Sequence, residues 1–158
     1  GKLTVYLESF QDNEFPGQIV EWTKKDSQAK VKASIFEISK TLKFFNLMYD
    51  NTALDVSDGK LALVADLDNT KDKEKDKEDK KDVEKKTIVT RAKSVEQILV
   101  EECTGEASSA YPVKSFIDCL EALSAIWVNL EFVQMVTDDL FICKMTHGNT
   151  VILLCPLI

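Results

Sequence analysis

Apolar residues recur at helical spacing in one early stretch of the chain, residues 34–46. The stretch starts at Ser34, a residue type that favours the N-cap position of a helix. Its apolar residues, three or four positions apart, are Ile35, Ile38, Leu42 and Phe45. Its polar positions are Glu37, Lys40 and Lys43. This spacing places the two sets on opposite faces and predicts an amphipathic helix over 34–46.

A second helix is predicted over 115–126, with Phe116, Ile117, Leu120 and Leu123 facing inward. Strand-like stretches surround both helices. After the first helix they cover 52–56 and 60–67, joined by a predicted turn at 57–59. In the second half they cover 97–102, 109–113, 128–136, 140–146 and 150–154, with predicted turns at 104–105, 137–139 and 147–149.

The chain therefore has two similar halves, each with one helix and a set of strands. We predict an α+β fold in which the two helices lie side by side and cover one face of an antiparallel sheet. A single domain over 17–158 is expected, with 1–16 as a linker or edge strand leading into it. A length of 158 residues is sufficient for one ordinary hydrophobic core.

One stretch interrupts this pattern. Residues 71–86 contain eight lysines, seven acidic residues and one valine, so the stretch cannot bury an apolar face. Because the charges alternate in sign, it does not resemble a basic nucleic-acid-binding tail. We predict that 69–93 is a solvated insertion in the domain.

The remaining composition limits the possible functions. No apolar run is long enough for a transmembrane helix, and the start lacks the pattern of a signal peptide. We expect a cytoplasmic protein with reduced thiols and without a membrane partner. Whether the chain is a fragment of something longer is left open by the sequence. The net charge of −7 argues against non-specific nucleic-acid binding by the whole surface, although one local basic face is compatible with it.

Enzyme chemistry finds little support. The four cysteines and the single His147 lie too far apart for a metal site. The five glycines are not clustered, so no phosphate-binding loop is indicated. The pair Asp138 and Asp139 is explained by a turn. Cys119 and Cys143 lie within apolar patterns and are expected to be buried. We therefore predict no catalysis, no cofactor and no metal.

The chain ends in an apolar run, residues 151–158. One interpretation is a terminal strand whose tail closes the core. The other is a surface groove, partly built by the C-terminus, that binds a short partner peptide. In this second interpretation Cys155, Pro156 and Leu157 are expected to be exposed, because proline tends to lie at strand ends.

Four stretches in this order resemble the C-terminal (third) domain of the bacterial DNA polymerase III β sliding clamp. Residues 7–16, a polar run with an aromatic residue and Pro16, are similar to the linker into that domain. Residues 32–46 with 52–67 resemble its first helix and hairpin. Residues 109–126, with Phe116 before Leu-Glu-Ala-Leu, resemble its second helix, and 151–158 resemble its terminal strand. Eukaryotic and archaeal clamps share the same half-domain repeat.

Two departures from the family stand out. The family's tail usually reads Met-Pro-Met-Arg-Leu, whereas this chain ends Cys-Pro-Leu-Ile and lacks the basic residue. After the linker proline the family has basic residues, but this chain has residues 17–21, which contain none. Such a groove is expected to prefer apolar side chains over a polar or acidic peptide.

The resemblance implies a processivity factor in DNA replication or repair. Its partners would be DNA polymerase or other clamp-binding peptides, double-stranded DNA held weakly inside a ring, and further clamp domains or copies of the chain. The implied groove residues are Pro16, Val20, Leu153, Leu154, Cys155, Pro156 and Leu157. The implied DNA-facing residues are Lys40, Lys43 and Lys114.

Each assignment has an ordinary alternative: core packing for Leu153 and Leu154, and a solvated helix face for the lysines. Asp118 and Glu121 on the second helix would repel phosphate. The alternative function is therefore a stand-alone protein-interaction domain of clamp fold that does not encircle DNA.

Overall fold

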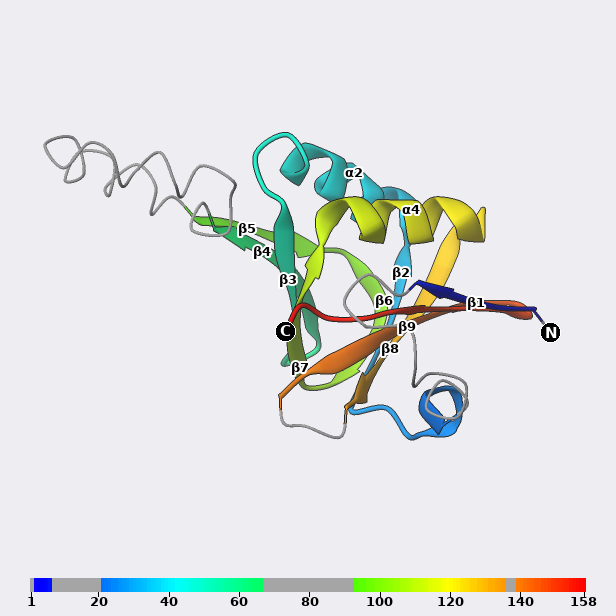
Figure 1. The fold of residues 1–158 in the computed structure, drawn as a ribbon. Helices are drawn as coiled ribbons and strands as arrows, with labels where there is room; N and C mark the ends of the chain where they lie inside the picture. The colour runs from blue at the N-terminus through cyan, green and yellow to red at the C-terminus, as the bar shows by residue number, and fades with distance from the viewer. Residues whose placement is uncertain (1, 7–20, 67–92, 136–138) are drawn as a thin grey trace, which may run out of the picture.

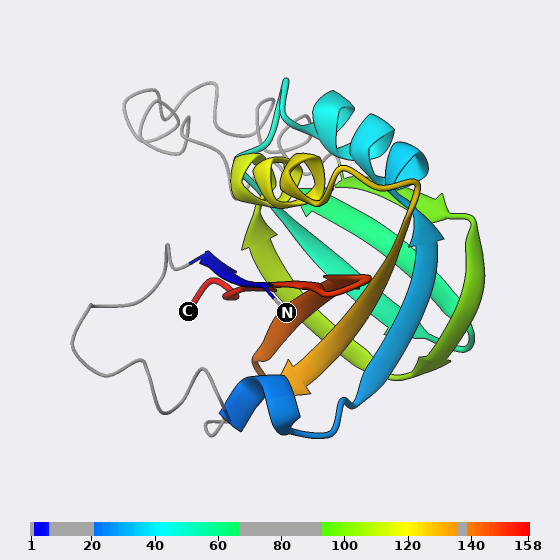
Figure 2. The same ribbon diagram turned by 90° about the vertical axis from the view of Figure 1, so that its right-hand side faces the viewer.

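The computed structural model describes residues 2–6, 21–66, 93–135 and 139–158. Two helices lie side by side in one layer, and two sheets curve beneath them (Figures 1 and 2). The helices are α2 (Ile35–Phe45) and α4 (Val113–Leu123). This is the predicted arrangement, except that the strands form two sheets in place of one.

The first sheet, sheet A, has six strands in the order β1-β10-β9-β8-β2-β6. All neighbouring pairs are antiparallel except β1 and β10, which run parallel. Its strands are β1 (Lys2–Tyr6), β2 (Ala29–Ser34), β6 (Val100–Gly105), β8 (Trp127–Gln134), β9 (Phe141–His147) and β10 (Thr150–Leu154).

The second sheet, sheet B, has the antiparallel order β5-β4-β3-β7. Its strands are β3 (Asn51–Ser57), β4 (Lys60–Asp66), β5 (Lys93–Ile98) and β7 (Ala107–Pro112). Asp58 and Gly59 join β3 to β4 with positive φ at both residues, which is the geometry of a tight hairpin. The predicted turn at 57–59 is therefore confirmed.

The two halves exchange their first strands. Each half runs strand, helix and then three antiparallel strands: β2-α2-β3-β4-β5 and β7-α4-β8-β9-β10. The strand β2 pairs with β8 of the second half, and β7 pairs with β3 of the first half. Each sheet is therefore completed by the other half, so neither half can form its sheet alone.

Several predicted boundaries need correction. Residues 97–102 are not one strand, because β5 ends at Ile98 and β6 begins at Val100. Strand β2 was not predicted. The second helix covers 113–123 instead of 115–126, and it ends where Ser124 adopts a left-handed conformation. Leaving the helix there allows Trp127 to start β8 opposite Ser34.

Ser34 occupies the predicted N-cap position, but its side chain makes no capping hydrogen bond. As the last residue of β2, it is held instead by the strand pairing.

Gly105 is required at the end of β6, where φ is +82° and a Cβ atom would lie 2.1 Å from the carbonyl oxygen of Gln28. The charged insertion lies almost wholly outside the described residues, as do the residues of the turn predicted at 137–139 except Asp139.

The main core lies between the helices and the inner faces of both sheets. Its largest fully buried side chains include Phe45, Phe116, Phe132, Leu42 and Leu120. Cys119 and Cys143 are fully buried, as predicted. The two sheets are also joined by polar contacts. The Tyr111 hydroxyl donates to the carbonyl oxygen of Phe141 at 2.6 Å, and the Phe141 amide donates to Ser109 Oγ at 2.9 Å.

Candidate functional site

The terminal strand β10 divides its side chains between two environments. Leu154 faces the main core beneath the helices, with 1% of its surface exposed. Leu153 is equally buried but points to the opposite face of sheet A, where it belongs to a small second apolar cluster. Alternation along a strand makes this separation unavoidable. Leu153 and Leu154 therefore do not line one common surface.

The tail after β10 is packed, not exposed. Cys155 has only 2% of its surface exposed, Pro156 is buried and Leu157 is half-buried. The Leu157 amide donates a 2.8 Å hydrogen bond to the carbonyl oxygen of Ala110 in β7. The tail leaves sheet A and reaches sheet B (Figure 1), so the expectation of an exposed tail was wrong for Cys155 and Pro156. Proline ends the ladder here, but the chain then docks on the neighbouring sheet.

Burial also determines the chemistry of the tail cysteine. It raises the pKa of the Cys155 thiol to about 12, because a thiolate is poorly solvated there. Burial raises the pKa of Cys143 well above its usual range as well. Such thiols stay protonated at neutral pH and are poor nucleophiles. Among the described residues, no group of three histidine, cysteine or acidic side chains could hold a metal ion.

The second apolar cluster covers the outer face of sheet A. Its buried members are Trp22, Val133, Met135, Ile142 and Leu153. Trp22 belongs to a single helical turn at 21–24, and only 5% of its surface is exposed. The indole therefore covers the apolar surface that β8, β9 and β10 present on this face.

Two lysines hold this turn against the sheet. Lys144 on β9 donates to the Thr23 carbonyl oxygen at 2.8 Å, and Lys25 donates to the Gln134 carbonyl oxygen at 2.9 Å. Lys144 Nζ also lies 3.6 Å from a Glu131 carboxylate oxygen, with 15% of its side chain exposed. The cluster thus combines an apolar centre with a nearly buried cation at its rim.

Pro16 and Val20, the two groove residues assigned from the N-terminal stretch, lie outside the described residues. Sequence reasoning missed Trp22 and Lys144. The available signal was a tryptophan in the otherwise polar stretch 21–28. A large aromatic residue in such a stretch needs an apolar partner elsewhere in the fold.

The helix layer carries the three lysines assigned to a DNA-facing surface, and all three are exposed. Lys40 pairs with Glu37 at 3.2 Å, and Lys43 pairs with Glu121 on the other helix at 3.6 Å. Lys114 lies on α4, which also carries Asp118. The structure brings Lys43 to the boundary between the helices, beside an acid that neutralises it.

Charges on the helix layer balance. Helix α2 carries Glu37, Lys40 and Lys43, and α4 carries Lys114, Asp118 and Glu121, so three positive and three negative charges sum to zero. Phosphate binding depends on an excess of cations that replaces condensed counterions. Large apolar side chains are also exposed on α2 (Phe36 and Phe44), just after α2 (Leu47 and Met48) and just after α4 (Ile126 and Trp127). This surface is suited to weak phosphate contact at most.

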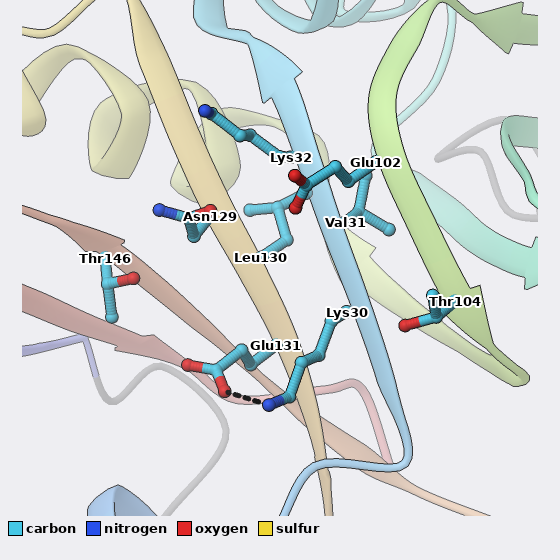
Figure 3. A pocket seen from close by; sticks show the side chains of 9 residues that line it. All are labelled: Lys30, Val31, Lys32, Glu102, Thr104, Asn129, Leu130, Glu131 and Thr146. Carbon is cyan, nitrogen blue, oxygen red and sulfur yellow. Dashed lines mark ion pairs between the residues drawn. The ribbon is translucent and has the colours of Figure 1, made fainter.

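A separate depression lies on the outer face of sheet A between β2, β6 and β8 (Figure 3). Lys30 Nζ lies 3.9 Å from a Glu131 carboxylate oxygen, as the dashed line marks. Lys32 pairs with Glu101 at 3.6 Å. Because both lysines are paired with acidic residues, we assign no anion site to this depression.

None of the helices described is long and apolar enough to cross a membrane.

Comparison with known proteins identifies the fold. Neither the models of protein families nor the curated proteins give a match. Among solved structures, the DNA polymerase III β subunit of Thermotoga maritima matches with a TM-score of 0.65 and 16% identity, over 93% of this chain and 35% of that chain. The DNA polymerase sliding clamp of Bacillus subtilis matches with a TM-score of 0.62 and 14% identity, over 94% and 35%.

The sliding clamp of Pseudomonas aeruginosa bound to griselimycin is similar to the same degree, with a TM-score of 0.62 and 14% identity over 93% of this chain and 35% of that chain. The chain thus spans about a third of the length of the clamps it matches. At these identities the likeness shows the fold alone. The chain has the α+β fold of a DNA sliding clamp domain, as its sequence predicted.

Proposed function

We propose that this chain is a sliding-clamp domain that contributes to a ring around DNA and tethers partner proteins in replication or repair. One observation carries the proposal: the strand-exchanged repeat with paired helices superposes on bacterial clamps over nearly the whole chain. The function is non-enzymatic. The mechanism is topological, because a closed ring keeps a partner on DNA without reading its sequence.

Ring closure requires more than this chain, which covers about 35% of each matching clamp. Other clamp domains or further copies of the chain would supply the rest. Among the strands that the structure describes, β1 and β6 are the edges of sheet A, and β5 and β7 are the edges of sheet B. A neighbouring domain could extend either sheet across such an edge through main-chain hydrogen bonds.

In such a ring the helix layer would face the DNA, with Lys40, Lys43 and Lys114 as its cations. Because acids on the same helices balance these charges, the contact would be weak and non-specific. A weak contact suits a ring that slides. The ring would act in the cytoplasm, on the polymerase or other proteins that carry a clamp-binding peptide.

The partner-peptide site would lie where the two ends of the domain meet. Its proposed walls are Pro16, Val20, Leu153, Leu154, Cys155, Pro156 and Leu157. Leu157 is half-buried and is the member best placed for contact, because Leu154 packs in the main core and Leu153 packs in the second cluster with Trp22. Tethering raises the local concentration of a partner, so a micromolar contact suffices for processivity.

The test uses the full-length protein that contains this chain, together with its loading factors, on nicked circular DNA. Gel filtration in 150 mM salt should show protein retained on circles and released when a restriction enzyme linearises them. Retention that persists after linearisation, or no retention at all, would contradict encirclement. A variant with Lys40, Lys43 and Lys114 changed to glutamine should slide off linear DNA as before but load onto circles more slowly.

A second candidate is a protein-interaction domain of clamp fold that does not encircle DNA. The balanced charge of the helix layer and its exposed Phe36, Phe44 and Leu47 favour it. It predicts that clamp-binding peptides still bind, while circular and linear DNA are retained equally poorly. The same experiment therefore separates the two functions.

A further inference from the structure

The Trp22 turn occupies the surface that Leu153 offers to a partner. Leu153 pairs in register with Lys144, and Lys144 pairs in register with Glu131, so the three side chains form one row across the outer face of sheet A. Val133 and Ile142 form the next row. Trp22 packs in one cluster with these apolar side chains, and Leu153 in that cluster has 1% of its surface exposed. A partner cannot contact Leu153 while the indole lies there.

We propose that the helical turn at 21–24, here called the Trp22 turn, competes with partner peptides for the same site. It covers that site until a peptide with an aromatic anchor displaces it. The proposal depends on the proposed partner groove in one respect, which is that Leu153 belongs to the groove. The contacts of the turn define the chemistry of the displacing peptide. An aromatic side chain fills the apolar centre, and the next residue places a carbonyl oxygen on Lys144 Nζ, as Thr23 does at 2.8 Å.

The attachment of the turn is suited to reversible displacement. Besides the packing of Trp22, the contacts that hold the turn include hydrogen bonds from two lysines, and the bond between Lys25 and the Gln134 carbonyl is solvent-exposed. Lys144 keeps its ion pair with Glu131 after the turn leaves, so the lysine charge still has a partner. Glu131 in turn accepts a hydrogen bond from Ser27 at 3.3 Å. The charged groups at the rim of the site therefore keep partners when the turn leaves, and the arriving aromatic side chain covers the apolar centre again.

Tethering favours the turn over a free peptide. A segment joined to its own site by a short linker has an effective concentration on the order of millimolar. A peptide with the same contacts therefore binds the intact chain poorly. It binds well only when the turn is removed, or when it makes further contacts that the turn does not make.

The experiment measures binding of a fluorescein-labelled peptide, Glu-Trp-Thr-Lys-Lys-Asp, identical to residues 21–26. Fluorescence anisotropy should show at least 10-fold tighter binding to Trp22→Ala than to the wild type. Trp127→Ala is the matched control, because Trp127 is 43% exposed at the start of β8 and lies outside the cluster. It should bind the peptide as poorly as the wild type. Replacing the peptide's tryptophan with alanine should abolish binding to Trp22→Ala.

A second variant covers the case in which Trp22→Ala does not fold. Lys25→Gln removes an exposed tether and leaves the cluster untouched, so it should bind the peptide about threefold more tightly than the wild type does. The proposal is overturned if folded Trp22→Ala gains no affinity over Trp127→Ala. It is also overturned if Trp22→Ala is unfolded and Lys25→Gln gains none. No DNA or clamp partner enters this test, so failure of the ring function leaves its outcome unaffected.

Discussion

The two halves share one chain path but differ on the outer faces of their three-stranded units. In the first half, β3, β4 and β5 present a mixed face outward, in which Ala62, Val64 and Val95 alternate with polar side chains such as Asp55 and Lys60. In the second half, β8, β9 and β10 present Val133, Ile142 and Leu153, which lie beneath Trp22. The repeat accounts for the fold, and the divergence of these outer faces locates the candidate partner site in the second half.

The two helices also differ in how much of their surface is buried, and again the second half is the more covered one. Seven residues of α4 are buried, whereas only three residues of α2 are, although both helices have eleven residues. Helix α2 leaves Phe36 and Phe44 exposed, at 70% and 53% of their surface. The second half is therefore packed on more sides than the first. The predictions below test how the two halves differ and how they are joined, from the largest expected effect to the smallest.

The largest effect is expected at the shared core. Leu42 and Leu120 occupy the same position in the two helices, and neither exposes any surface. Leu42→Ala and Leu120→Ala should each lower the free energy of unfolding by about 2–5 kcal/mol, because each leaves a cavity. Urea denaturation followed by circular dichroism measures both. A loss below about 1 kcal/mol at either site would show that the repeat is not packed equivalently.

A smaller effect is expected on the outer faces. Trp22→Ala should cost about 3 kcal/mol, because it uncovers the apolar cluster on sheet A. On sheet B, Val95 is 56% exposed, and Val95→Ala should change stability by less than about 0.5 kcal/mol. Thermal unfolding of both variants tests the contrast. Equal losses of stability in the two variants would mean that the outer faces of the two sheets are covered to the same extent.

Thiol reactivity should separate the segment between the halves from the second half. Cys103 on β6 is half-buried, whereas Cys119, Cys143 and Cys155 are buried. At pH 8, an aromatic disulfide reagent should modify Cys103 within minutes and the other three only after unfolding. Cys103→Ser should remove the fast phase. Fast modification of more than one thiol in the native protein would contradict the packed tail.

The same burial predicts the pH dependence. Burial raises the pKa of Cys155 from 9.0 to about 12 in the folded chain, so the unfolded thiol ionises first as the pH rises. The contribution of the protonated thiol is fully present below pH 9, and it declines as the pH rises from 9 towards 12. Cys155→Ala should flatten the fall in unfolding free energy over this range. An unchanged slope would mean that Cys155 is solvated.

The smallest effect is expected where the halves meet at the surface. Lys43 and Glu121 join α2 to α4 at 3.6 Å, with 61% and 59% of their side chains exposed. Glu121→Gln should change the unfolding free energy by less than about 0.5 kcal/mol, because solvent screens exposed pairs. Lys40→Gln is the control within one helix. A loss above about 1 kcal/mol for Glu121→Gln alone would make this pair a real link between the halves.

The sequence determined the elements whose pattern is local. Helical spacing located α2 and α4 to within three residues, the Asp58–Gly59 turn located the first hairpin, and the bounds of β10 were predicted correctly. Periodicity reports which face of an element is apolar, so it also predicted most of the buried positions of both helices, although Ile35 is only partly buried and the buried Val113 and Ser115 were missed. The order of these elements was sufficient to indicate the clamp fold.

The tertiary structure decided which elements meet. Strand β2 carries two lysines among small apolar residues, and only its pairing with β6 and β8 makes it a strand. Alternation along β10 places Leu153 and Leu154 on opposite faces of the sheet, but only the packing of the sheets decides what covers each face. Trp22 packs in the same cluster as Leu153, more than a hundred residues away in sequence. Such contacts depend on how the sheets pack, and no local pattern encodes them.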